Sequence, residues 1–115
     1  MLISKIFKFD SAHKLPNYPG KCASLHGHTW KLIVSCSGEI DKKSGMIIDF
    51  CEISKIVNEK ILSKFDHAYL NNFIKNPTCE NILLAIKKEL EKTKLQGLKK
   101  LVLYENETSF CELEC

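Results

Sequence analysis

The sequence predicts an α+β fold, in which an antiparallel four-stranded sheet carries two helices on one face. Two runs with strand periodicity come first, two segments with helical periodicity follow, and two further strand-like runs close the chain. The 115 residues contain no internal repeat and no linker, so we expect a single domain over residues 1–115. A chain of this length builds a modest core but is short for an enclosed active site of its own.

The predicted strands are short runs rich in apolar residues. Along the second run, every second residue is large and apolar, namely Trp30, Leu32 and Val34. The last two runs are expected to form a closing hairpin around Asn106 and Glu107, although this pair is not one of the favoured Asn-Gly turns. The four predicted strands cover residues 1–9, 30–37, 100–105 and 108–113.

Two segments place apolar side chains at helical spacing, so each is predicted to form a helix that buries one stripe against the sheet. A polar connection over residues 38–45 precedes the first of them. The segment Asn76-Pro77-Thr78 is a start signal for the second helix. The stripe residues are Ile53, Ile56, Val57 and Ile61 in the first helix, and Ile82, Ile86 and Leu90 in the second.

A His-Gly-His motif leads into the second predicted strand. Side chains repeat every two residues along a strand, so His26 and His28 face the same way and can hold one metal ion. His13 is the third candidate ligand, because it shares the parity of Phe7 and Phe9 on the first run. Three imidazoles with a fourth position left for water are typical of catalytic zinc, whereas four protein ligands close a structural site. The alternative interpretation is that the motif consists of ordinary turn and strand residues.

The composition argues against several classes of protein. A mean hydropathy of −0.13 excludes a membrane span. Lysines interrupt the apolar residues near the N-terminus, so no signal peptide is expected, and we expect a cytoplasmic location. Three lysine pairs occur, Lys42-Lys43, Lys87-Lys88 and Lys99-Lys100, and none is interleaved with aromatic residues. Since no nucleic-acid motif is present either, we expect no nucleic-acid partner.

The lysine and cysteine content limits which groups can contact a phosphate and which thiols can react. All seventeen basic residues are lysines, so a phosphate on a substrate must be met by ammonium groups, hydroxyls or backbone N–H groups. Lys14 and Lys21 flank the histidine motifs and are candidates for this contact, although a lone lysine usually faces solvent. The six cysteines form no Cys-x-x-Cys pair and are expected to be free thiols. Only Cys22, which precedes the His-Gly-His motif, is given a functional interpretation.

Six short motifs follow one another along nearly the whole chain. They are Phe9-Asp10-Ser11-Ala12-His13, Cys22-x3-His26-Gly27-His28, Gly45-Met46-Ile47-Ile48-Asp49-Phe50, Asp66-His67 with Leu70-Asn71, Asn76-Pro77-Thr78-Cys79-Glu80-Asn81, and Tyr104-Glu105. In type and order they resemble the motifs of the 6-pyruvoyltetrahydropterin synthase family, which includes the bacterial 6-carboxytetrahydropterin synthases. The resemblance implies a tunnelling fold, whose subunits join edge strands into a barrel as trimers or hexamers, with sites at the subunit boundaries. Such closure would also remove exposed sheet edges.

The resemblance also assigns roles to the polar residues of these motifs. The three histidines would hold Zn²⁺, and Cys22 would take a proton, because a thiol near a cation shifts toward its thiolate. Asp66 and His67 would act with Cys22 as a relay across the substrate's side chain. Adjacent residues on a regular strand face opposite ways, so we expect this pair in a turn after the first helix. Without the resemblance, it reads as a cap or loop pair.

Glu105 is the implied anchor for the pterin ring. A carboxylate accepts the ring N–H and the exocyclic amino group side by side, as a bidentate pair. The parity of Glu105 with Leu101 and Leu103 favours an inward position, against the alternative of a solvent-facing carboxylate. Thr78 and Glu80 match family positions that line the pterin pocket from a neighbouring subunit.

The implied activity is that of a zinc-dependent pterin lyase. The short Cys-x3-His spacing resembles the 6-carboxytetrahydropterin synthase branch, which serves queuosine and deazapurine biosynthesis. That branch converts 7,8-dihydroneopterin triphosphate to 6-carboxy-5,6,7,8-tetrahydropterin, acetaldehyde and triphosphate. The alternatives are 6-pyruvoyltetrahydropterin synthase, whose product keeps a three-carbon side chain, and a non-catalytic, zinc-stabilised pterin-binding module. The complete set of Cys22, Asp66, His67 and Glu105 argues against the binding module, because pure binding needs no thiol relay.

Overall fold

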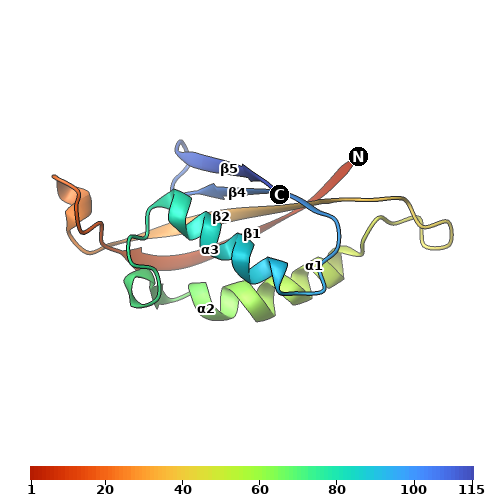
Figure 1. Ribbon diagram of the computed structural model, residues 1–115, viewed down its shortest axis with the longest axis horizontal. Helices are drawn as coiled ribbons and strands as arrows, with labels where there is room; N and C mark the ends of the chain where they lie inside the picture. The colour runs from red at the N-terminus through yellow and green to blue at the C-terminus, as the bar shows by residue number, and fades with distance from the viewer.

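Five strands form one mixed sheet in the computed structural model, which describes residues 1–115 (Figure 1). The strands are β1 (Leu2–His13), β2 (His26–Ser37), β3 (Ala68–Tyr69), β4 (Leu98–Tyr104) and β5 (Phe110–Glu114). They lie in the order β3-β1-β2-β4-β5, and every neighbouring pair is antiparallel except β1 and β3. The predicted α+β class is confirmed.

The sheet departs from the sequence prediction in strand number and in strand ends. The prediction of four strands was wrong because β3 has only two residues, too few for a two-residue period to be recognised. β1 continues to His13 and β2 begins at His26, whereas the prediction ended the first strand at residue 9 and began the second at residue 30. The small and polar residues in these extensions hide the alternation, yet they pair in unbroken register up to the facing pair His13 and His26.

The helices lie together on one face of the sheet, as predicted (Figure 1). α1 (Phe50–Val57) runs on through a π-helical turn, Asn58–Leu62, into the short α2 (Ser63–Phe65), and α3 (Cys79–Glu91) follows. Asp49 caps α1 by accepting the Cys51 N–H at 2.8 Å, and Thr78 caps α3 by accepting the Asn81 N–H at 3.1 Å. None of these helices is long and apolar enough to cross a membrane.

The core lies between these helices and the inward side chains of the sheet. Every predicted helical stripe residue is buried except Ile56, which is partly buried and packs against the core. On the sheet side, Phe9 stacks on Trp30 with ring centroids 6.3 Å apart. His13 is fully buried on this same face, at the end of the alternation that begins with Phe7 and Phe9. The apolar core therefore continues directly into the predicted metal ligands.

One glycine before β4 is required by a close backbone contact. Gly97 has a φ of 72°, its carbonyl accepts the Ser37 N–H at 2.8 Å, and a Cβ on it would lie 2.1 Å from the Ser37 carbonyl oxygen. We expect Gly97→Ala to lower the free energy of unfolding by about 2–4 kcal/mol, through left-handed strain and forced backbone displacement. Gly45→Ala is the matched control, because Gly45 has a φ of 74° with no atom within 4 Å of its Cβ position. Equal losses in urea unfolding would contradict the role of the contact.

Candidate metal centre and catalytic groups

Three imidazoles meet where β1 ends and β2 begins. The candidate ligand nitrogens of His13, His26 and His28 all lie within 4.8 Å of one another. The Nε2 atoms of His13 and His26 are 2.9 Å apart. Trp30 closes the site on the core side, since its ring centroid lies 5.2 Å from that of His13 and 5.3 Å from that of His28. The predicted convergence of the three histidines is confirmed.

Backbone carbonyls fix the tautomers of two of these rings. His13 Nδ1 lies 2.8 Å from the Pro77 carbonyl oxygen, and His26 Nδ1 lies 2.7 Å from that of Ser24. A carbonyl oxygen only accepts, so both Nδ1 atoms carry the hydrogen, and each neutral ring presents a bare Nε2 lone pair. Two lone pairs that face each other at 2.9 Å repel unless a cation or an extra proton lies with them. The donor set therefore fits a metal ion that imidazole favours, such as zinc.

His28 completes the fit. Its Nε2 is buried and has no hydrogen-bond partner among the protein atoms, so this nitrogen is suited to be a metal ligand. Burial lowers the pKa of His28, and the neighbouring His13 and His26 lower it further, while Glu105 opposes them. The ring therefore stays neutral at neutral pH, as a metal ligand must.

Glu105 lies against the imidazoles. One of its oxygens, Oε1, is 3.5 Å from Nε2 of both His13 and His28. The residue follows the last residue of β4, and its N–H donates to the Ser109 carbonyl oxygen at 3.0 Å. A cleft of about 520 Å³ opens beside Glu105 and His28. The predicted inward position is confirmed, and the carboxylate can serve either a metal or a hydrogen-bond donor in the cleft.

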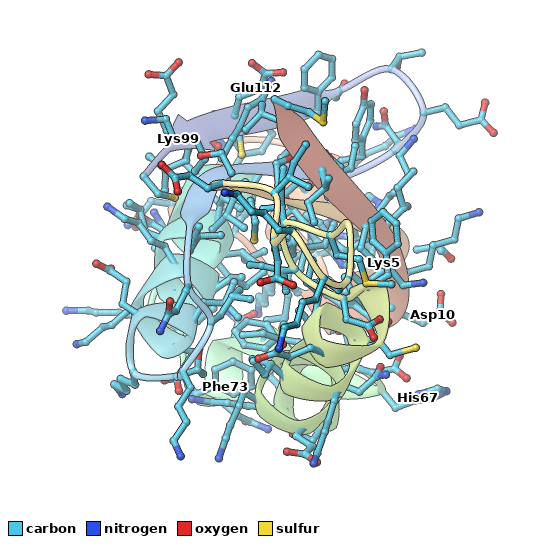
Figure 2. All side chains as sticks on the ribbon, turned by 90° about the vertical axis from the view of Figure 1, so that its right-hand side faces the viewer. Lys5, Asp10, His67, Phe73, Lys99 and Glu112 are labelled. Atoms are coloured by element: carbon cyan, nitrogen blue, oxygen red, sulfur yellow. The ribbon has the colours of Figure 1, made fainter.

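Asp66 and His67 form a second polar group, in the predicted turn after the first helix. His67 has a φ of 53°, and its Nδ1 lies 3.1 Å from Asp66 Oδ2. Asp10 holds the pair from β1, donating its N–H to Asp66 Oδ1 at 2.9 Å and accepting the His67 N–H at 2.7 Å. Figure 2 shows Asp10 and His67 on the same side of the molecule. A cleft of about 530 Å³ is lined by both residues and also reaches His28.

The charge state of Asp66 follows from these bonds. The N–H of Asp10 holds the pKa of the Asp66 carboxyl below its usual range, and His67 adds to this effect. The carboxylate is therefore ionised at neutral pH and orients the imidazole beside it. The stability that it contributes is present above the ordinary carboxyl pKa and is lost only as the pH falls through the lowered value.

Cys22 stands apart from both groups within one chain. It lies in a 3₁₀ turn, Lys21–Ala23, and its carbonyl oxygen accepts the Leu15 N–H at 3.0 Å, which folds the long loop after β1 back on itself. Its thiol is partly exposed and makes no hydrogen bond to the histidines or to Asp66 and His67. The structure therefore does not bring the predicted relay together in one chain.

Thr78 and Glu80 lie at the start of α3, where the Thr78 hydroxyl is the helix cap and Glu80 is exposed. A cavity of about 830 Å³, larger than either of these clefts, lies elsewhere, beside Lys64 and Phe73, and is lined by no predicted site residue. We attach no function to its size, because the polar groups that converge on His28 are all outside it.

Several supporting residues were missed from the sequence. The carbonyl groups of Pro77 and Ser24 orient His13 and His26, but a backbone atom leaves no signal in residue type. Asn71 clamps the start of the long loop, since its side chain accepts the Lys14 N–H at 2.9 Å and donates to the Lys14 carbonyl at 2.8 Å. The only sign of this role in the sequence was that Asn71 belongs to the Leu70-Asn71 motif.

Comparison with known proteins agrees with this geometry. The family model described as 6-pyruvoyl tetrahydropterin synthase matches residues 2–115. A provisionally named 6-carboxy-5,6,7,8-tetrahydropterin synthase of Archaeoglobus fulgidus is 40% identical over 98% of this chain and 95% of its own. The 6-carboxy-5,6,7,8-tetrahydropterin synthase of Haemophilus influenzae is 34% identical over 97% of both chains. A dihydroneopterin monophosphate aldolase of Pyrococcus furiosus is 39% identical over 92% of this chain and 90% of its own.

The fold is also that of a solved structure. The structure of Caenorhabditis elegans 6-pyruvoyl tetrahydropterin synthase matches with a TM-score of 0.92 and 24% identity, covering 100% of this chain and 95% of the other. The predicted tunnelling fold is thereby confirmed. With a family model that covers almost the whole chain and relatives above one-third identity, the chain belongs to the 6-pyruvoyl tetrahydropterin synthase family.

Proposed function

We propose that the chain is a zinc-dependent 6-carboxy-5,6,7,8-tetrahydropterin synthase. It would convert 7,8-dihydroneopterin triphosphate to 6-carboxytetrahydropterin, acetaldehyde and triphosphate, in queuosine and deazapurine biosynthesis. The observation that carries the proposal is the pair of facing lone pairs in a three-imidazole cluster, with Glu105 at its edge. The names of the relatives from Archaeoglobus and Haemophilus support this product over others.

His13, His26 and His28 would hold the zinc. The bound ion would act as a Lewis acid on a substrate oxygen and lower the pKa of a hydroxyl bound there. The carbonyl groups of Pro77 and Ser24 would keep both neighbouring rings in the ligating tautomer. Trp30 would keep water from the core side, since it is fully buried.

The other polar residues would bind the ring and move protons. Glu105 would accept the pterin N–H and amino group in the cleft beside His28. Cys22 would take a proton as its thiolate, and His67, oriented by the ionised Asp66, would hold or release a second one. Thr78 and Glu80 would line the pocket of a neighbouring subunit.

Cys22 is separated from Asp66 and His67 within one chain, which supports a site built from two subunits. Cys22 lies in the loop beyond β1, whereas Asp66 and His67 lie beside the edge strand β3. We expect trimers stacked as a hexamer, with edge strands joined and Cys22 facing the Asp66-His67 pair of a neighbour. Light scattering at the assay concentration checks this, and a fully active monomer would rule it out.

Product analysis tests the proposed reaction. Mass spectrometry after incubation with 7,8-dihydroneopterin triphosphate should show a carboxypterin and acetaldehyde. A pyruvoylpterin would instead identify a 6-pyruvoyl tetrahydropterin synthase, and binding without turnover would identify a binding module. The Pyrococcus relative makes dihydroneopterin monophosphate a necessary second substrate, and cleavage of the monophosphate alone would identify an aldolase.

Glu105→Gln separates an anchor from a metal ligand. Because a hydrogen bond to a charged group contributes about 1.5–3 kcal/mol, we expect pterin affinity to fall roughly 10- to 150-fold while zinc content is unchanged. Glu114→Gln is the matched control, since Glu114 is exposed on β5, lies outside this cleft, and has no ion pair with the histidines. Zinc lost in parallel with affinity would make Glu105 a fourth ligand.

A further inference from the structure

Two cysteines outside the proposed catalytic groups face each other across the fold. Cys79 is the first residue of α3, and Cys111 lies on β5, 32 positions later. Their sulfur atoms are 3.2 Å apart, and both side chains are partly buried. No other pair among the six cysteines is in hydrogen-bond contact.

The contact is built by the sheet. Cys111 pairs directly with Leu103 across the β4-β5 ladder, and the Cys79 thiol donates to the Leu103 carbonyl oxygen at 3.3 Å. The Cys79 sulfur thus contacts both this carbonyl and the Cys111 sulfur, and either thiol can be the donor between the two sulfurs. Both thiols are thereby held in position, with sulfur facing sulfur.

We propose that Cys79 and Cys111 form a reversible intramolecular disulfide that ties the start of α3 to β5. A disulfide needs its two sulfurs to approach to about 2.05 Å, so the side chains must close by little more than 1 Å. The bond would fix the helix turn that carries Thr78 and Glu80 relative to the strand pair that ends beside Glu105. The inference stands on its own geometry and does not require the proposed reaction.

The oxidant would be a low-molecular-weight disulfide, such as oxidised glutathione. The thiolate of Cys111 attacks one sulfur of the oxidant and expels one glutathione thiolate, leaving a mixed disulfide. The thiolate of Cys79 then attacks the Cys111 sulfur and expels the second glutathione. Two protein S–H bonds are thus replaced by one S–S bond, while the oxidant's S–S bond is replaced by two S–H bonds, so atoms and electrons balance.

Burial sets the rate of this exchange. Desolvation raises the pKa of both thiols, and Cys111 raises that of Cys79 further. Because the thiolate is the nucleophile, the bond should form slowly at neutral pH and faster in alkaline buffer. The same burial would keep the pair reduced during brief exposure to an oxidant.

Intact-mass spectrometry tests the proposal. The reduced, folded protein is incubated with oxidised glutathione, quenched with acid and compared with the starting material. We expect a loss of two hydrogens with no retained glutathione, one cross-linked peptide pair that joins Cys79 and Cys111, and full reversal by dithiothreitol. The melting temperature of the oxidised form should rise by roughly 10 °C, from closure of a loop of this length.

Single substitutions separate this pair from the other cysteines. Cys79→Ser and Cys111→Ser should each abolish the loss of two hydrogens, whereas Cys51→Ser, at an exposed position on α1, should leave it intact. A cross-link between other cysteines, a stable glutathione adduct on Cys111 without ring closure, or an unchanged mass after prolonged alkaline incubation would each overturn the proposal.

Discussion

Replacing His26 with alanine is expected to remove zinc and turnover together. His26 supplies one of only three imidazoles, and its Nε2 lies 2.9 Å from that of His13, so its loss leaves two ligands. Loss of a residue that merely orients a ligand costs about 10- to 100-fold in metal affinity or activity, so loss of a ligand should exceed roughly 100-fold. Zinc content by elemental analysis, measured beside turnover, checks the prediction.

A histidine outside the cluster provides the control for metal content. His67→Asn removes an imidazole that is not a proposed ligand, and asparagine tolerates the positive φ of 53° at this position. This variant should keep its zinc while its turnover falls. If His26→Ala retained zinc at the level of the unaltered protein, the ligand set would have to include another group, with Glu105 the nearest on geometry.

The histidine cluster was predictable because strand parity is a local property. His13 shares the buried face of Phe7 and Phe9, and His26 shares that of His28, so the face of each side chain follows from counting residues. The register that places His13 opposite His26 is set by the whole β1-β2 ladder. No short motif contains that register, so strand parity made His13 a candidate ligand but could not place it opposite His26.

Other features depend on contacts that residue type does not reveal. The strand β3 forms because the Asp66-His67 turn is bonded to Asp10, not because Ala68 and Tyr69 favour a strand. The sequence also gives no sign that α1 continues into a π-helical turn, because the apolar stripe keeps an ordinary helical spacing. The sequence thus predicts the type of each element and the face on which a side chain lies. It predicts less well where an element ends and which residues it contacts.

The sequence is equally silent on which of the proposed catalytic residues lie close together in one chain. The family resemblance implied that Cys22 acts with Asp66 and His67, yet no hydrogen bond joins them within the chain. Sequence motifs report which residues a reaction needs but not which subunit supplies each. Because Cys22 lies apart from Asp66 and His67 in one chain, we propose above that a second copy completes the site.

Cys22→Ala should leave zinc bound and stop the chemistry. The thiol lies in the loop that precedes His26 and is not in hydrogen-bond contact with the three imidazoles, so removing it deletes no proposed ligand. Pterin affinity should persist, because Glu105 is untouched. General acid-base groups contribute about 10²–10⁴-fold, so turnover should fall by at least that range if the Cys22 thiolate takes a proton from substrate.

The informative measurement is zinc content, pterin affinity and turnover on the same Cys22→Ala preparation. Cys51→Ala is the matched control, since Cys51 is exposed on α1 and far in sequence from both histidine motifs, and it should retain all three properties. Cys22→Ser should restore the shape of the side chain without activity, because a hydroxyl ionises far less readily than a thiol. Zinc lost in step with activity would make Cys22 a fourth ligand and the centre structural, since a four-ligand site leaves no position open for substrate.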